Sequence, residues 1–143
     1  MFQKINTQFI FSYLGLIPYF FIILDKYYFF QIKEEILLDF SVYYTLIIIV
    51  FIGSMNWNLH NKIENYIVFY GVSPSLFATL IIFLNLINFS LFLIIFFLIL
   101  ILIFQLYFDY ILIYSRKINK KVFFLLRIPL TIAIIFILII IKF

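Results

Sequence analysis

Two consecutive apolar stretches decide the fold of this chain: FSLFLIIFFLILILIFQLYFDYILIY, residues 89–114, and VFFLLRIPLTIAIIFILIII, residues 122–141. Each stretch carries one ionisable residue in its interior, Asp109 in the first and Arg127 in the second. An ionised side chain in hydrocarbon costs roughly 3 kcal/mol, so it persists there only when it is paired or has a function. The two stretches therefore predict a membrane protein with an internal polar site.

The composition of the whole chain supports the same class. Hydrophobic residues make up 68% and charged residues 11% of the 143 positions, against roughly 45–50% and about 25% in globular proteins. A soluble domain of this length could not enclose so much apolar surface. The absence of cysteine excludes disulfides and thiolate metal sites. We expect no metal and no cofactor, and the lipid bilayer as the surrounding partner.

The apolar stretches predict one all-α transmembrane domain over residues 1–143, a bundle of about five helices. Each span needs about 20 mainly apolar residues. The expected spans are residues 9–24, 41–57, 66–86, 89–114 and 122–141. The first is expected to be a retained anchor, because no small-residue cleavage site follows it.

Positive charge predicts how the chain is oriented. Basic residues at positions 4, 62, 116, 117, 120 and 121 fall on one side of a five-span chain, and Lys26, Lys33 and Lys142 on the other. Cytoplasmic loops are the more basic ones, so the N-terminus should lie inside and the C-terminus outside. The net charge of +4 is therefore attributed to the basic residues that orient the chain, and nucleic acid is not an expected partner. The expected location is the bacterial inner (plasma) membrane, or the mitochondrial inner membrane for an organellar chain.

The segment between the first two spans leaves two interpretations open. Its apolar residues recur at helical spacing from Phe29 to Phe40. A short helix lying in the outer interface fits this pattern, and a solvated loop fits it equally well.

Depth predicts that the two internal charges meet. Asp109 lies about 10 Å before the basic loop and Arg127 about 9 Å beyond it, at a helical rise of about 1.5 Å per residue. A planar guanidinium suits a buried carboxylate because it can donate two hydrogen bonds to it. Gln105 and Thr131, each four residues from one of the charges, share their helix faces.

The second span contributes a face of its own near its C-terminal end. Gly53, Asn56, Trp57 and His60 follow one another at helical spacing. Gly53 would permit close approach of a neighbouring helix, and Asn56 could donate a hydrogen bond across it. His60 is the only histidine, so a surface or headgroup contact is expected rather than a metal or haem ligand.

The third span contains a proline, which predicts a local break in hydrogen bonding. Pro74 has no amide hydrogen and leaves the carbonyl of Tyr70 without its helical donor, so the hydroxyl of Ser73 or Ser75 should satisfy it. Trp57 is expected to lie near Ser73 or Pro74. The remaining packing and kink positions predicted from small residues and prolines are Gly15, Pro18 and Gly71.

These polar positions favour a protein without enzymatic activity. The sequence contains no nucleophile elbow, zinc-protease motif or phosphate-binding loop. The leading interpretation is a polar cluster that fixes helix packing and docks a partner or assists assembly of a membrane complex. The alternative is a small transporter or proton-conducting subunit that uses Asp109, Gln105 and Arg127. A lipid-acting enzyme with Asp109 as general base is the third interpretation.

Five short motifs in order carry a family resemblance: Leu14-Gly-Leu-Ile-Pro18, Phe51-Ile-Gly53-Ser-Met-Asn-Trp57, Tyr70-Gly-Val-Ser-Pro74, Asp109 and Leu125-Leu-Arg127-Ile-Pro-Leu-Thr131. They resemble a multi-pass family that includes mitochondrial transmembrane protein 69 and proteobacterial inner-membrane proteins. The resemblance implies a small helical inner-membrane protein and no particular substrate. Members often carry His where this chain has Asn56, which argues against chemistry that requires an imidazole there.

Overall fold

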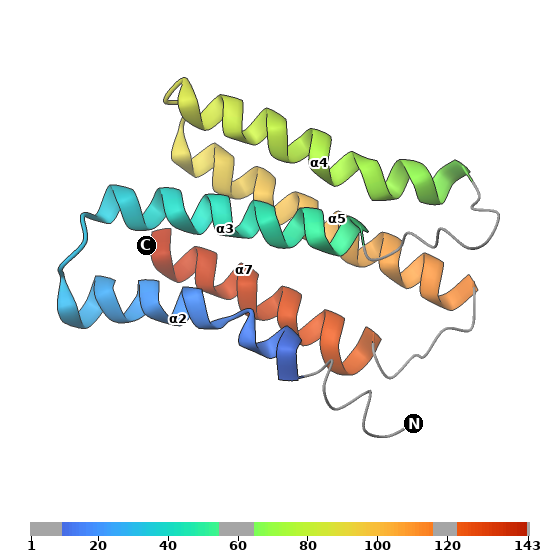
Figure 1. The fold of residues 1–143 in the computed structure, drawn as a ribbon, viewed down its shortest axis with the longest axis horizontal. Helices are drawn as coiled ribbons and strands as arrows, with labels where there is room; N and C mark the ends of the chain where they lie inside the picture. The colour runs from blue at the N-terminus through green and yellow to red at the C-terminus, as the bar shows by residue number, and fades with distance from the viewer. Residues whose placement is uncertain (1–9, 55–64, 116–122, 143) are drawn as a thin grey trace. The chain divides into compact units, whose positions relative to one another are not determined.

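The fold is helical throughout the part of the chain that the structure describes. The computed structural model describes residues 10–54, 65–115 and 123–142, and no strand occurs among them. Figure 1 shows the helices as a ribbon. Their bounds are α2 (Ile17–Leu24), η1 (Asp25–Phe29), α3 (Glu34–Ser54), α4 (Asn65–Leu86), α5 (Leu91–Ser115), η2 (Phe123–Arg127) and α7 (Ile128–Lys142).

Five of the described helices are long and apolar enough to cross a membrane. They cover residues 10–29, 34–54, 65–86, 91–111 and 123–142. Their hydropathy and length follow from the aliphatic and aromatic runs in the sequence, which leave few charges inside any of them. The predicted helical fold class and the predicted number of long apolar helices are both confirmed at this level.

The first of these helices is broken near its start. Residues 10–14 are helical, a turn follows at Gly15 and Leu16, and α2 then begins with Pro18 as its second residue. Because proline has no amide hydrogen, it fits the first turn of a helix better than the interior. The kink predicted at Gly15 and Pro18 therefore lies where the helix restarts.

The segment expected to be an interface helix or a loop is divided: residues 30–33 are not helical, and residues 34–40 belong to α3. α3 begins at Glu34 and runs without interruption to Ser54, so the helix begins seven residues before the predicted start of the span at residue 41. Glu34 and Glu35 lie in its first turn, where carboxylates interact favourably with the helix dipole. Neither glycine nor proline interrupts the helix before Gly53, so it extends beyond the apolar run that marked the span.

Two compact units form within the domain, and their boundaries fall inside α3 and α5. One consists of residues 1–41 and 109–143, and the other of residues 42–108; we call them unit 1 and unit 2. In unit 1, Tyr19 of α2 and Leu138 of α7 are completely buried. In unit 2, Ile49 of α3 and Leu98 of α5 are completely buried. Both units thus contribute completely buried apolar residues.

Candidate functional site

The ion pair of Asp109 and Arg127 is the first polar feature, and it lies in unit 1. Arg127 donates from Nε to Asp109 Oδ2 at 2.7 Å, and its Nη2 donates to the same oxygen. Asp109 is 3% exposed, and the side chain of Arg127 is 15% exposed. Hydrogen bonds between ionised partners are stronger than neutral ones. Each charge therefore has a compensating partner where solvation by water is scarce.

The backbone that presents Arg127 is widened into a π-helical turn, η2. Pro129, two residues after Arg127, has no amide hydrogen to offer the carbonyl of Leu125, four residues before it. Tyr13 supplies a donor instead: its hydroxyl donates to the carbonyl oxygen of Leu125 at 2.8 Å. Wide turns of this kind occur frequently at functional sites. Tyr13 thus ties the first helix to the turn that carries the guanidinium.

A second set of polar contacts joins three helices in unit 2. Gln105 of α5, which is 3% exposed, donates from Nε2 to the carbonyl of Ile49 in α3 at 2.7 Å. Tyr70 of α4 donates from its hydroxyl to the carbonyl of Gln105 at 3.2 Å. Among the described residues, Gln105 Oε1 is the buried side-chain oxygen without a hydrogen-bond partner. Gln105 therefore joins α5 to α3 through its amide donor, while its Oε1 makes no hydrogen bond to the described residues.

Close packing of α3 on α4 accompanies these contacts. A Cβ atom placed on Gly53 would lie 2.6 Å from Pro74 Cγ and 3.3 Å from the carbonyl oxygen of Gly71. Both distances are too short for an ordinary contact, so only glycine fits here without displacement. The prediction that Gly53 allows a neighbouring helix to approach closely is confirmed.

The carbonyl released by Pro74 has the partner that the sequence predicts. Ser73 donates from its hydroxyl to the carbonyl of Tyr70 at 3.2 Å. Ser75 instead donates to the carbonyl of Val72 at 2.7 Å. The predicted repair of the backbone by a neighbouring serine is therefore confirmed, with Ser73 as the donor. Ser73 makes this bond within its own helix.

The structure says less about the other predicted site residues. Thr131 of α7 is buried. Asn56, Trp57 and His60 lie outside the described residues, and so does the predicted contact of Trp57 with Ser73 or Pro74. Within the described ranges, no group of three or more histidine, cysteine, aspartate or glutamate side chains could hold a metal ion.

One end of unit 1 carries a group of polar contacts that no sequence pattern predicted. Lys26 donates to the carbonyl of Ile141 and forms an ion pair with Glu34, with 3.2 Å between Nζ and Oε1. Tyr27 donates to the carbonyl of Ile140 at 3.2 Å. The last carbonyls of a helix have no donor within the helix and carry its negative dipole end. The η1 side chains therefore cap the end of α7.

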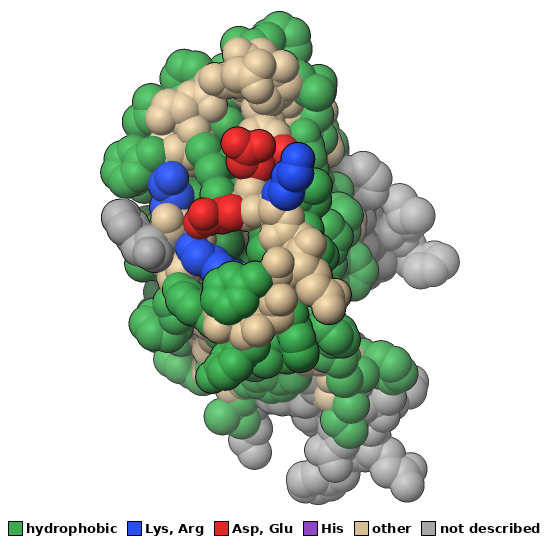
Figure 2. Space-filling view, turned by 90° about the vertical axis from the view of Figure 1, so that its left-hand side faces the viewer, with side chains coloured by type: hydrophobic (Ala, Val, Ile, Leu, Met, Phe, Trp, Pro, Cys, Tyr) green, Lys and Arg blue, Asp and Glu red, His purple; other side chains and the backbone are tan. Residues whose placement is uncertain are grey.

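Charged side chains gather around this capped end, as Figure 2 shows. Asp25 Oδ2 accepts a hydrogen bond from the amide of Ile32 at 2.9 Å, which closes the turn into α3. Phe30 in this turn adopts a left-handed conformation with φ of 52°. The only sequence signals were the charges themselves, since a cap between helices distant in sequence leaves no local pattern.

Comparison with known proteins found no counterpart: no family model, no curated protein and no solved structure matches the chain. The resemblance to the family of mitochondrial transmembrane protein 69 therefore stays a prediction.

Proposed function

We propose that this chain is a small, non-enzymatic inner-membrane protein with five spans, an inside N-terminus and an outside C-terminus. Its internal polar groups fix the packing of its helices, and its outer faces dock a partner or assist the assembly of a larger complex. The observation that carries the proposal is the Asp109–Arg127 ion pair. Two opposite charges on separate apolar helices compensate one another.

The geometry of the pair favours a structural role over transport. A carboxylate on a solute or proton pathway must be free to exchange partners, whereas Asp109 is buried in an ion pair with Arg127. Oδ2 already accepts two donors from Arg127. Because these internal charges are engaged in packing, the chain is better suited to present its surface to a partner than to carry out a reaction. This supports a docking or assembly role.

One observation favours the transporter as the second candidate. Gln105 Oε1 is a buried acceptor without a hydrogen-bond partner among the described residues. An unsatisfied buried acceptor costs about 1–3 kcal/mol, and pathways for protons or solutes use such groups in membranes. Gln105 is therefore the residue at which the two functions differ most.

Single and double substitutions of the ion pair test the structural role. Breaking a buried pair by removing one partner costs about 3–5 kcal/mol, whereas removing both is close to neutral. Asp109→Asn and Arg127→Gln should each lower the melting temperature in mild detergent, and the double variant should recover part of the loss. Glu35→Gln, at an exposed carboxylate outside the pair, is the matched control and should change the melting temperature far less, because only its interaction with the helix dipole is lost.

Two results would contradict the structural role. One is a set of single variants that melt like the wild type but abolish a cellular phenotype, which would favour the transporter. The other is a double variant whose loss equals the sum of the two single losses, because independent side chains give additive effects.

The docking role has its own test in mild detergent. Proteins that copurify with the wild-type chain should also copurify with the Asp109→Asn/Arg127→Gln double variant, provided that this variant keeps its fold. Recovery of the chain without any specific protein, from its native membrane and under several detergents, would contradict the docking role.

A further inference from the structure

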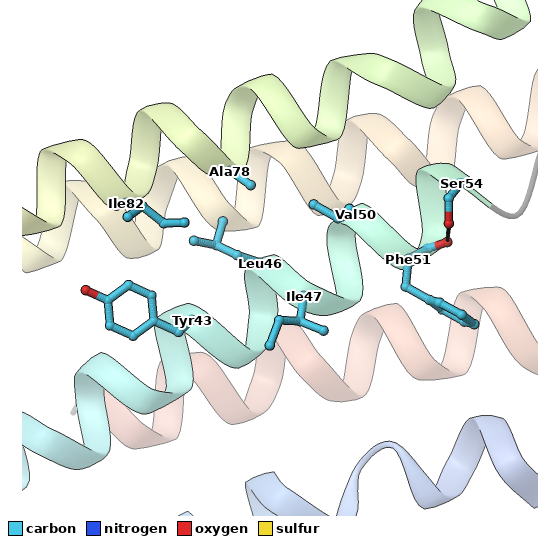
Figure 3. Close-up of a pocket in the computed structure, with 8 residues that line it drawn as sticks. All are labelled: Tyr43, Leu46, Ile47, Val50, Phe51, Ser54, Ala78 and Ile82. Carbon is cyan, nitrogen blue, oxygen red and sulfur yellow. Dashed lines mark hydrogen bonds between the residues drawn. The ribbon is translucent and has the colours of Figure 1, made fainter.

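Unit 2 contains a hollow between α3 and α4 with a volume of about 570 Å³. Figure 3 shows Leu46 of α3 and Ala78 and Ile82 of α4 turned toward one another across it. Leu46 and Ala78 are buried and form its floor, whereas Ile47 is 64% exposed and stands at its rim. The volume is in the range of small-molecule pockets, about 300–1,000 Å³.

Ala78 has the smallest side chain of the residues that line the hollow. It is one of only two alanines in the sequence, in a chain whose spans are otherwise built from leucine, isoleucine and phenylalanine. A methyl group at this position leaves open the space that a larger aliphatic side chain would fill. The residues that line the hollow include no charged side chain.

Two contacts between α3 and α4 bound the hollow along its length. At one end Gly53 packs against Pro74. At the other end Asn85 donates from Nδ2 to the hydroxyl of Tyr43 at 3.0 Å. From Tyr43 to Gly53 the helix rises about 15 Å. This length is about half the hydrocarbon thickness of a bilayer, which is about 30 Å.

The polar end of the hollow lies at the end of a span. α4 ends at Leu86, one residue after Asn85. Tyr43 lies midway along α3 but only four residues after Asp39, whose charge places the start of α3 at the membrane boundary. In a membrane-spanning chain the Tyr43–Asn85 pair would thus lie near the level of the lipid headgroups, where tyrosine is enriched. The apolar floor extends from there toward the bilayer centre.

We propose that this hollow binds one acyl chain of a phospholipid from the leaflet in which α4 ends. The uncharged lining matches a hydrocarbon chain, its length matches one leaflet, and the polar pair lies where the ester groups begin. A helix of another protein, with a diameter of about 10 Å, would have to separate α3 from α4 to reach the floor. This inference rests on the proposed insertion in a membrane.

Photo-crosslinking tests the acyl-chain site. The probe is a phospholipid with a diazirine at the middle of one acyl chain, in vesicles of phosphatidylethanolamine and phosphatidylglycerol that contain the full chain. Label should concentrate on Leu46 to Val50 and on Ala78 to Ile82. Ala78→Leu fills the floor and should reduce that label severalfold, whereas Ala133→Leu, the same change at the other alanine, should leave it unchanged.

A second pair of variants distinguishes loss of the site from misfolding of the Ala78→Leu variant. Ile82→Phe narrows the hollow from its rim and should also reduce the label, with Ile132→Phe on the exposed face of α7 as its control. Label spread evenly over all apolar faces and insensitive to both changes would overturn the site. So would a dimer in detergent that Ala78→Leu converts to a monomer, because a second copy would then occupy the hollow.

Failure of the site and failure of the proposed function give different results. Alkaline carbonate extraction of the same vesicles shows whether the chain is inserted. If carbonate releases the chain, the proposed membrane protein fails. If the chain stays in the membrane and the label is uniform, only the acyl-chain site fails.

Discussion

At the scale of single residues, prolines and hydroxyls act together in this chain. Pro74 and Pro129 each deny an amide hydrogen to the carbonyl four residues earlier. Ser73 donates to one of these carbonyls from within its helix, and Tyr13 donates to the other from a different helix. The bond of Tyr13 is exposed on the protein and that of Ser73 is partly buried. A carbonyl without a donor is costly wherever water is excluded, so in a membrane both hydroxyls would stabilise the fold where its backbone pattern is interrupted.

Tyr13→Phe should destabilise the protein by about 1 kcal/mol, the usual net contribution of one hydrogen bond. The ring is kept and only the donor to Leu125 is lost. Tyr28→Phe is the matched control, because Tyr28 is 74% exposed. Thermal unfolding in mild detergent measures both. Equal melting temperatures for Tyr13→Phe and the wild type would show that the carbonyl has another partner.

Gly53→Ala should destabilise the protein by about 1–3 kcal/mol, the usual cost of overpacking. The added methyl group would meet the ring of Pro74 at 2.6 Å. Gly53→Ala combined with Pro74→Ala should recover part of the stability, because the second change removes the atom in conflict. If the two losses simply add, α3 and α4 do not meet at these residues.

Much of the residue-scale detail could be predicted from sequence, but only where a local rule applies. The roles of Gly53 and Ser73 follow from the absence of a side chain and from the absence of an amide hydrogen at Pro74. Tyr13 could not be predicted, because its bond to Leu125 joins positions far apart in sequence. Pro129 marks the carbonyl in need of a donor but does not indicate which helix supplies it.

At the scale of the elements, two π-helical turns present the polar side chains of unit 1. η1 carries Asp25, Lys26 and Tyr27, and η2 ends at Arg127. The first caps the end of α7, and the second presents the guanidinium to α5. Hydropathy predicted the long helices correctly, but it placed the start of α3 too late because charges in a first helical turn resemble a loop.

Lys26→Met should loosen the end of α7 without unfolding unit 1. The substitution keeps the apolar stem and removes the donor to Ile141 and the partner of Glu34. Hydrogen exchange should therefore accelerate over the last turn of α7. Lys33→Met, at an exposed lysine in the neighbouring turn, is the control and should leave this exchange unchanged. Unchanged exchange in Lys26→Met would contradict the cap.

At the scale of the whole molecule, the described residues form five long apolar helices with a few internal polar contacts. Composition predicted the helical class, because hydrocarbon tolerates few other structures, and the lengths of the apolar stretches predicted the number of these helices. The division into two compact units could not be predicted, since it depends on which helix faces meet. Orientation still rests on the unequal distribution of basic residues between the two sides.

Reporter fusions show whether the chain crosses a membrane five times with its N-terminus inside. A reporter that works only outside the membrane should be active when it is fused after Lys33. A reporter that works only inside should be active when it is fused after Lys120. A fusion after Lys142 should agree with the one after Lys33, since Lys26 contacts the last turn of α7. If the fusions after Lys33 and Lys120 report the same side, the five-span account is wrong.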